Sequence, residues 1–110
     1  MVVIDTNIII KRVKNKEEIA ENITEVSVIE YPPILGYKNF RGRIHLIERR
    51  DIAKAIELQR KLRRRGLPKG IADLLIAAIC INRNEKLVTM DENFLDIAKV
   101  SNLNVELLKD

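Results

Sequence analysis

The fold of this chain is decided by its opening stretch, Val2-Val3-Ile4-Asp5-Thr6-Asn7. A short apolar run that ends in an acidic residue is typical of a buried strand in a parallel sheet. The charge at the end of such a strand is costly to desolvate unless a cation or hydrogen-bond donors compensate it. The same carboxylate could instead cap the helix that follows. The stretch therefore predicts a strand, a helix and one candidate site residue, Asp5.

Three more acids occupy comparable places, where other helices are expected to begin. Glu30 follows Ser27-Val28-Ile29, Asp73 follows Gly70-Ile71-Ala72, and Asp91 follows Leu87-Val88-Thr89-Met90. In an open α/β sheet, such positions converge outside the carboxyl ends of the strands, where these folds bind ligands. Carboxylates held close together repel one another unless a cation lies between them. We therefore expect a divalent-metal site formed by Asp5, Glu30, Asp73 and Asp91.

The order of the expected elements predicts an α/β fold with a mostly parallel sheet covered on both faces. Strands are expected at 2–5, 23–26, 43–47, 86–89 and 105–108, and helices at 7–14, 48–65, 70–81 and 91–99, with a helical turn at 17–22. Ser27 and Glu30 match a capping box, which would start a helix that reaches Tyr37 or Phe40. Pro32 and Pro33 conflict with a smooth helix, so it either kinks or restarts with Pro32 in its first turn.

Length and composition restrict the class of protein. The 110 residues fit one domain, and 46% hydrophobic with 33% charged residues allow a buried core in water. The longest apolar stretch, 74–81, has only eight residues and is too short to span a bilayer, and no basic lead segment marks a signal peptide. Cys80 is the only cysteine, which excludes an intrachain disulfide and a zinc cluster. A reducing cytoplasm is the expected location.

The positive charge is concentrated in the middle of the chain. Residues 38–69 contain twelve Lys or Arg and three acids, a net charge of +9, which leaves −5 for the rest of the chain. A basic segment beside an acidic cluster is typical of a protein that attracts a polyanion and acts on it through metal ions. Within this segment we expect RNA contacts from Arg60, Arg63, Arg64 and Arg65. A solvated helix face is the alternative.

The other polar residues offer supporting roles rather than a second chemistry. Thr6, Asn7 and Thr89 stand beside the acids and could orient carboxylates or water, or serve only in turns and caps. The single histidine, His45, has no Ser or Cys nucleophile placed for it, and Cys80 lies in an apolar helix. No glycine-rich phosphate loop follows a strand. Oxygen ligands alone suit Mg²⁺ or Mn²⁺.

Taken together, these motifs resemble those of the PIN-domain ribonucleases, most closely the VapC-type toxins of prokaryotic toxin–antitoxin pairs. The resemblance spans residues 1–110 as a single PIN-like domain. It rests on Val3-Ile4-Asp5-Thr6-Asn7, on Glu30 after the second strand, on Asp73-Leu74-Leu75-Ile76-Ala77-Ala78 and on Leu87-Val88-Thr89-Met90-Asp91-Glu92-Asn93-Phe94. Asn93 stands where the family often has an aspartate, and we place it with the residues that support the acids.

The resemblance implies an α/β/α sandwich of about five strands that cleaves RNA with Mg²⁺ or Mn²⁺. Asp5, Glu30, Asp73 and Asp91 would be both the catalytic residues and the metal ligands. It also implies homodimers, and inhibition by a small antitoxin that enters the active cleft. The alternative is a non-catalytic RNA-binding or scaffold protein with the same fold. A receiver-like phosphoacceptor domain would need an acidic pair after the first strand, where Thr6 and Asn7 stand.

Overall fold

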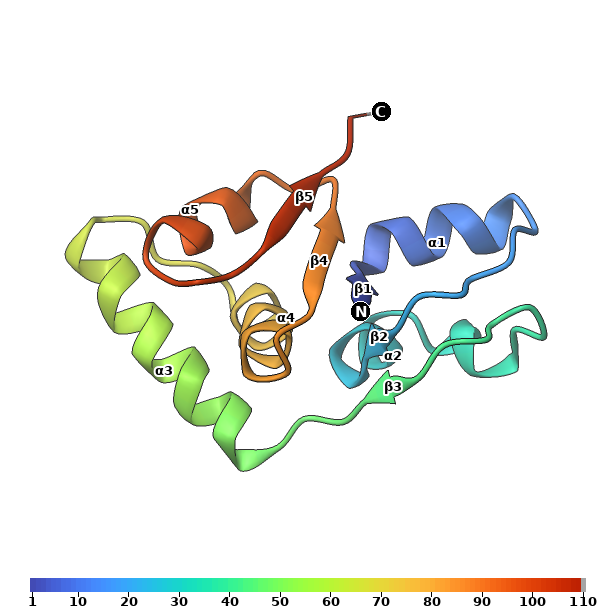
Figure 1. The fold of residues 1–110 in the computed structure, drawn as a ribbon, viewed down its shortest axis with the longest axis horizontal. Coiled ribbons are helices and arrows are strands. Elements are labelled where there is room, and N and C mark those ends of the chain that lie inside the picture. The colour runs from blue at the N-terminus through green and yellow to red at the C-terminus, as the bar shows by residue number, and fades with distance from the viewer. Residues whose placement is uncertain (110) are drawn as a thin grey trace.

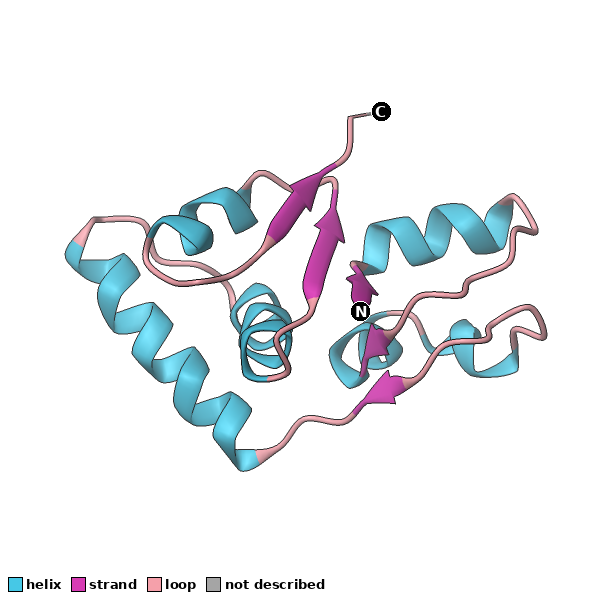
Figure 2. Cartoon of the chain, in the orientation of Figure 1, coloured by secondary structure: helices cyan, strands magenta, loops and turns pink. Residues whose placement is uncertain are grey.

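Parallel strands and helices alternate along the computed structural model, which describes residues 1–109 (Figure 1, Figure 2). The strands are β1 (Val2–Ile4), β2 (Ile23–Thr24), β3 (Ile44–His45), β4 (Lys86–Thr89) and β5 (Val105–Leu107). The helices are α1 (Thr6–Lys14), α2 (Glu25–Glu30), the 3₁₀ helix η1 (Pro32–Gly36), α3 (Arg49–Arg64), α4 (Ile71–Asn82) and α5 (Asn93–Lys99). Each of the five predicted strands is present, and no helix in the described part is long and apolar enough to cross a membrane.

The strands form a three-stranded sheet in the order β1-β4-β5 and a two-stranded sheet, β2-β3, and all their pairings are parallel. Asn22 joins the two sheets, because its backbone exchanges hydrogen bonds with Val2 and Ile4 of β1. The resulting order is β3-β2-β1-β4-β5. The chain moves outward from β1 in one direction and then crosses back to β4 on the other side. The carboxyl ends of β1 and β4 therefore flank the switch point, where such sheets bind ligands.

Successive strand residues point to opposite faces of the sheet and divide the core in two. Val3 and Leu87 pack with the buried residues of α3, α4 and α5. Ile4 and Val88 pack on the other side with buried isoleucines of α1. Both central strands are thus covered on both faces, which explains why their sequences are apolar without alternation. The predicted α/β/α sandwich is confirmed.

The prediction of a helical turn at 17–22, after α1, is wrong. Residues 17–22 form no helical turn but run extended, with bridges from Ile19 to Phe40 and from Val3 to Asn22. Gly42 permits this close approach, since a Cβ atom there would collide with the carbonyl of Glu21. Pairing with a distant segment satisfies the backbone here, and the local sequence carries no sign of it.

The predicted capping box at Ser27 is also wrong. Helix α2 starts earlier, at Glu25, because the Thr24 hydroxyl caps it by accepting the Ser27 N–H at 3.3 Å. Glu30 is therefore the last residue of α2, not an acid at the start of a helix. Tyr31 leaves the helical conformation, as expected before a proline, and the chain restarts in η1 with Pro32 at its first position. The helix does not reach Tyr37 or Phe40.

Helices α3 and α4 are fastened together by a buried carboxylate. Asp51 is fully buried, and its oxygens accept hydrogen bonds from Arg83 Nη1 at 2.8 Å, Asn82 Nδ2 at 2.9 Å and the Glu48 N–H at 2.8 Å. Burial raises the pKa of Asp51, but these hydrogen bonds outweigh it and hold the pKa below its ordinary value. The start of α3 is thus held against the end of α4, which fixes the direction of the helix that carries Asp73.

Candidate active site

The four predicted acids line one pocket of about 310 Å³, together with Thr6, Asn7 and Ile10. Asp5 caps α1, Glu30 ends α2, Asp73 lies in the first turn of α4, and Asp91 follows β4. The pocket opens at the switch point between β1 and β4. The fold therefore assembles in one place four carboxylates that are up to 86 positions apart in the sequence.

Asp5 lies at the base of this pocket and is only 6% exposed. Its Oδ1 atom accepts the Thr6 N–H at 2.8 Å, and its Oδ2 atom accepts the Thr89 hydroxyl at 2.7 Å. Burial raises the pKa of Asp5, the hydrogen bonds from Thr89 and Thr6 lower it, and the charges of Asp91 and Glu30 raise it again. The net direction is upward. The helix-cap interpretation of Asp5 is confirmed, and the same carboxylate lines the acidic pocket.

Thr89 positions two of the acids at once. Its hydroxyl donates to Asp5 and accepts the backbone N–H of Asp91 at 3.0 Å. Asp91 in turn accepts the Asn93 N–H at 2.9 Å, which begins α5. The turn after β4 is thereby bound to the end of β1.

Glu30 is held by a chain of hydroxyls. Thr6 Oγ1 donates to Glu30 Oε1 at 2.6 Å and lies 2.8 Å from Ser27 Oγ. Because the Thr6 proton is directed to the carboxylate, Ser27 donates to Thr6. Ser27 is 1% exposed and reaches the site from the middle of α2. Sequence reasoning assigned Ser27 to a helix cap and missed this role.

Asp73 completes the group from α4. The Asn93 side chain approaches its Oδ2 atom at 3.5 Å. Burial raises the pKa of Asp73, and the charges of Asp91, Asp5 and Glu30 raise it further. This mutual repulsion is the expected behaviour of carboxylates gathered without a cation.

Lys69 is a second residue that sequence reasoning missed. Its Nζ atom lies 2.7 Å from Asp96 and 3.4 Å from the Asn93 side chain. The Gln59 side chain fixes the backbone of Lys69 at both ends, donating to its carbonyl at 2.8 Å and accepting its N–H at 3.1 Å. The loop before α4 is thus held against the start of α5. Only its place in a basic segment distinguished Lys69 in the sequence.

The pocket fits a hard divalent cation, because all four of its charged side chains offer carboxylate oxygens as ligands. Within residues 1–109, however, no three Asp, Glu, His or Cys side chains are grouped closely enough to hold an ion as they stand. In this arrangement Asp5 accepts a hydrogen bond from the Thr89 hydroxyl, and Glu30 accepts one from the Thr6 hydroxyl.

Two of the four predicted RNA-binding arginines line one pocket. Arg64 and Arg65 line a second pocket with Lys61 and Lys99, whereas Arg60 and Arg63 do not. All four arginines are exposed on or just after the last turns of α3. Arg60, Arg63 and Arg64 are spaced i, i+3 and i+4, so they lie on the same side of the helix.

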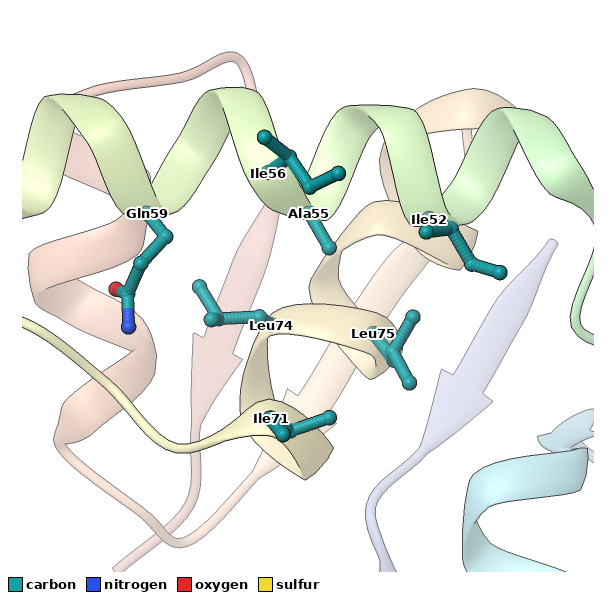
Figure 3. A pocket seen from close by; sticks show the side chains of 7 residues that line it. All are labelled: Ile52, Ala55, Ile56, Gln59, Ile71, Leu74 and Leu75. Carbon is teal, nitrogen blue, oxygen red and sulfur yellow. The ribbon is translucent and has the colours of Figure 1, made fainter.

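A third hollow, of about 390 Å³, is apolar and lies between α3 and α4 (Figure 3). Ile52 and Ile56 are 49% and 51% exposed, and Ile71 is 76% exposed. Four apolar residues of α3 recur at helical spacing, namely Ile52, Ala55, Ile56 and Leu62, with Gln59 on the same stripe. The core takes Ala55, Leu58 and Leu62 from this helix and leaves the two isoleucines about half exposed.

These features define a class: a parallel α/β domain with an acidic pocket at the carboxyl edge of its central strands. The chain belongs to the PIN domain family, whose model matches residues 37–100. No curated protein sequence matches the chain at a significant level.

Several solved structures have a similar fold. VapBC2 from Rickettsia felis, bound to a promoter DNA fragment, is 22% identical with a TM-score of 0.75, and the match covers 99% of this chain and 100% of that chain. DNA-bound VapBC from Salmonella typhimurium is 19% identical with a TM-score of 0.76, covering 96% of each chain. FitAcB from Neisseria gonorrhoeae is 17% identical with a TM-score of 0.72 and the same coverage. At these identities the likeness shows a shared fold.

Proposed function

We propose that this chain is a divalent-metal-dependent endoribonuclease and the toxin of a toxin–antitoxin pair. The observation that carries the proposal is the pocket in which Asp5, Glu30, Asp73 and Asp91 meet at the switch point of the sheet. A structural scaffold gains nothing from gathering four carboxylates that repel one another. We take residues 1–110 as one domain that acts in the cytoplasm, where its RNA substrate is found.

Asp5, Glu30, Asp73 and Asp91 would hold Mg²⁺ or Mn²⁺. When bound, such an ion supplies an activated water and neutralises charge on the phosphate that is attacked. The protein's own contribution is to fix the ligands. Thr89 orients the carboxylate of Asp5 and the backbone of Asp91, and Thr6 orients the carboxylate of Glu30, before the ion and the RNA arrive. Asn7 lines the same pocket and faces solvent, where it can contact the RNA.

The antitoxin would act on the same pocket. The solved structures with this fold include VapBC assemblies bound to DNA and a toxin–antitoxin complex, which supports a partner protein for this chain. A pocket lined by four acids attracts a cationic side chain, which would neutralise the carboxylates as a metal ion does. A partner segment that places an Arg or Lys there would block both metal and RNA.

The apolar hollow between α3 and α4 supports a homodimer. Ile52, Ile56 and Ile71 are each about half exposed or more around one groove, and a second copy that covered them would remove that apolar surface from water (Figure 3). Dimers are also what the resemblance to the VapC-type toxins implies. The groove adjoins the first turn of α4, so a dimer would bring a second subunit close to the acidic pocket.

The proposal is tested with the Asp5→Asn variant. The amide is nearly isosteric with the carboxylate but is a poor ligand for a hard cation, so RNA cleavage should be abolished while the fold is kept. The exposed Glu57→Gln is the matched control and should cleave as wild type does. Cleavage is followed on a labelled RNA with Mn²⁺ and with excess EDTA. Wild-type cleavage in EDTA would exclude the metal mechanism, and RNA binding without any cleavage would favour the non-catalytic alternative.

A further inference from the structure

Four cations surround a pocket of about 350 Å³ that is separate from the acidic pocket. Lys61, Arg64 and Arg65 come from the end of α3, and Lys99 comes from the end of α5, beside Val100. Figure 1 shows the end of α3 lying near α5. Two parts of the chain that are more than 30 residues apart in sequence thus direct their positive charges into one hollow.

The helix dipole explains part of this arrangement but not all of it. Basic residues in the last turn of a helix stabilise it by about 0.3–1 kcal/mol each, and both helices end here. Most of the less exposed cations have an acidic partner, such as Arg12 with Glu21 and Arg83 with Asp51. In contrast, the side chains of Lys61, Arg64 and Arg65 make no ion pair or hydrogen bond within residues 1–109. The fourth cation, Lys99, lies 3.7 Å from Asp96, which balances part of its charge. The other three like charges around the hollow repel one another, and a bound anion would reduce that repulsion.

Helix α5 links this cationic pocket to the acidic one. Its first residue, Asn93, approaches Asp73, and its last residue, Lys99, lines the cationic pocket. Seven helical residues extend roughly 10 Å at 1.5 Å per residue. A polyanion lying along α5 could therefore occupy both pockets at the same time.

We propose that Lys61, Arg64, Arg65 and Lys99 form a subsite for RNA backbone phosphates a few nucleotides away from the bond that is cut. This inference rests on the proposed ribonuclease function. No aromatic side chain lines the pocket, so the subsite would hold the backbone and would not stack on bases. Its contribution should be independent of sequence and should weaken with salt.

The test replaces all four cations with glutamine: Lys61→Gln, Arg64→Gln, Arg65→Gln and Lys99→Gln. The matched control removes four exposed lysines elsewhere: Lys14→Gln, Lys16→Gln, Lys38→Gln and Lys109→Gln. Both variants lose the same net charge. Each is compared with wild type on a long single-stranded RNA and on a dinucleotide that is too short to reach both pockets.

For the long RNA, we expect a raised KM, an unchanged kcat and a salt slope that falls by about 0.7 for each phosphate that the variant no longer binds. Dinucleotide cleavage should not change, and the control variant should keep the wild-type slope. Binding of the long RNA is also measured in the Asp5→Asn background, where no cleavage is needed. If the fourfold variant melts early, Arg64→Gln with Arg65→Gln alone should give half the effect.

Several results would overturn the subsite. An unchanged salt slope would show that RNA does not use this pocket and would leave an acidic protein as its partner. Equal weakening in the control variant would assign the effect to net charge. Loss of dinucleotide cleavage would mean that the cations act at the acidic pocket itself. If wild type cleaves neither substrate, the ribonuclease proposal fails, while the binding measurement still decides whether the pocket holds RNA.

Discussion

The Thr89 hydroxyl donates to Asp5 Oδ2 at 2.7 Å and so joins the ends of β1 and β4 across 84 positions of sequence. The same oxygen accepts the N–H of Asp91 at 3.0 Å. One small side chain therefore sets the direction of one acid and the backbone of another.

Replacement of Thr89 by valine should reduce RNA cleavage by roughly 10- to 100-fold, the range typical of groups that orient metal ligands. Valine has nearly the same shape but leaves Asp5 with one donor and the Asp91 N–H with none. Thr89→Ser restores the hydroxyl and should recover most of the rate. Single-turnover cleavage at saturating Mn²⁺ measures the effect, and a valine variant with the wild-type rate would contradict it.

The stability of the metal-free protein should fall as pH rises above the ordinary range of an aspartic acid. Burial and the charges of Asp91, Asp5 and Glu30 raise the folded pKa of Asp73 above its ordinary value of 3.8. The folded protein then binds more protons than the unfolded chain, so the contribution of Asp73 is fully present below that value. It is lost as pH rises through the raised pKa. Thermal melts from pH 3.5 to pH 8 in EDTA should show less of this loss in Asp73→Asn.

Mn²⁺ should raise the melting temperature of the wild type in proportion to the logarithm of free metal. Asp73→Asn should behave in two opposite ways. Without metal it should be more stable at neutral pH, because one repelling charge is gone, and with metal it should gain little. The measurement is a series of melts over Mn²⁺ concentration. An equal gain in both proteins would remove Asp73 from the site.

Loss of the buried carboxylate at the start of α3 should cost about 3 kcal/mol of unfolding free energy. Asp51→Ala would remove the buried carboxylate that Arg83 and Asn82 share and leave Arg83 only Glu48 and two backbone carbonyls. Urea denaturation followed by circular dichroism measures the loss. Glu57→Ala removes an acid of the same helix that pairs with Lys54 on the surface, and it should leave the midpoint unchanged.

The apolar groove between α3 and α4 predicts a concentration-dependent dimer. Ile56→Asp places a charge in the groove and should give a monomer, since the charge would have to be desolvated for the subunits to pair. Leu46→Asp alters another exposed apolar residue, 59% exposed, and should remain dimeric. Sedimentation equilibrium distinguishes these states. A wild type that stays monomeric at every concentration would assign the groove to a different partner.

The hydrophobic pattern of the sequence correctly predicted the strands and the helix that carry three of the four acids. The apolar run before Asp5, the first turn that holds Asp73 and the strand before Asp91 each lie in the predicted element. The sequence also indicated that these acids would meet, because parallel strands end at a common edge. The PIN family match covers 37–100, and the fold confirms the sandwich over the rest of the described chain.

Long-range contacts could not be predicted in this way. Ser27 has the spacing of a capping residue, and only the packing of α2 against α1 turns its hydroxyl toward Thr6. Nothing in the sequence distinguishes Lys69 from the other basic residues. Its place is set by the Gln59 side chain, which binds the Lys69 backbone in the folded protein. The two isoleucines of α3 fit a helical stripe, but α4 covers the side that contains Leu58 instead. Each depends on where a distant element lies, which residue spacing does not specify.

The placement of β1 at the centre of the sheet has a consequence for a chain still on the ribosome. β1 is made before its partner β4 and the hydroxyl of Thr89, which follow more than 80 residues later. A nascent chain that ends before Thr89 has neither the donor that fixes Asp5 nor the carboxylate of Asp91. If the domain cuts RNA as we propose, its pocket is completed only after Asp91 has been made. Until that point the ribosome and the mRNA that it translates do not meet a complete site.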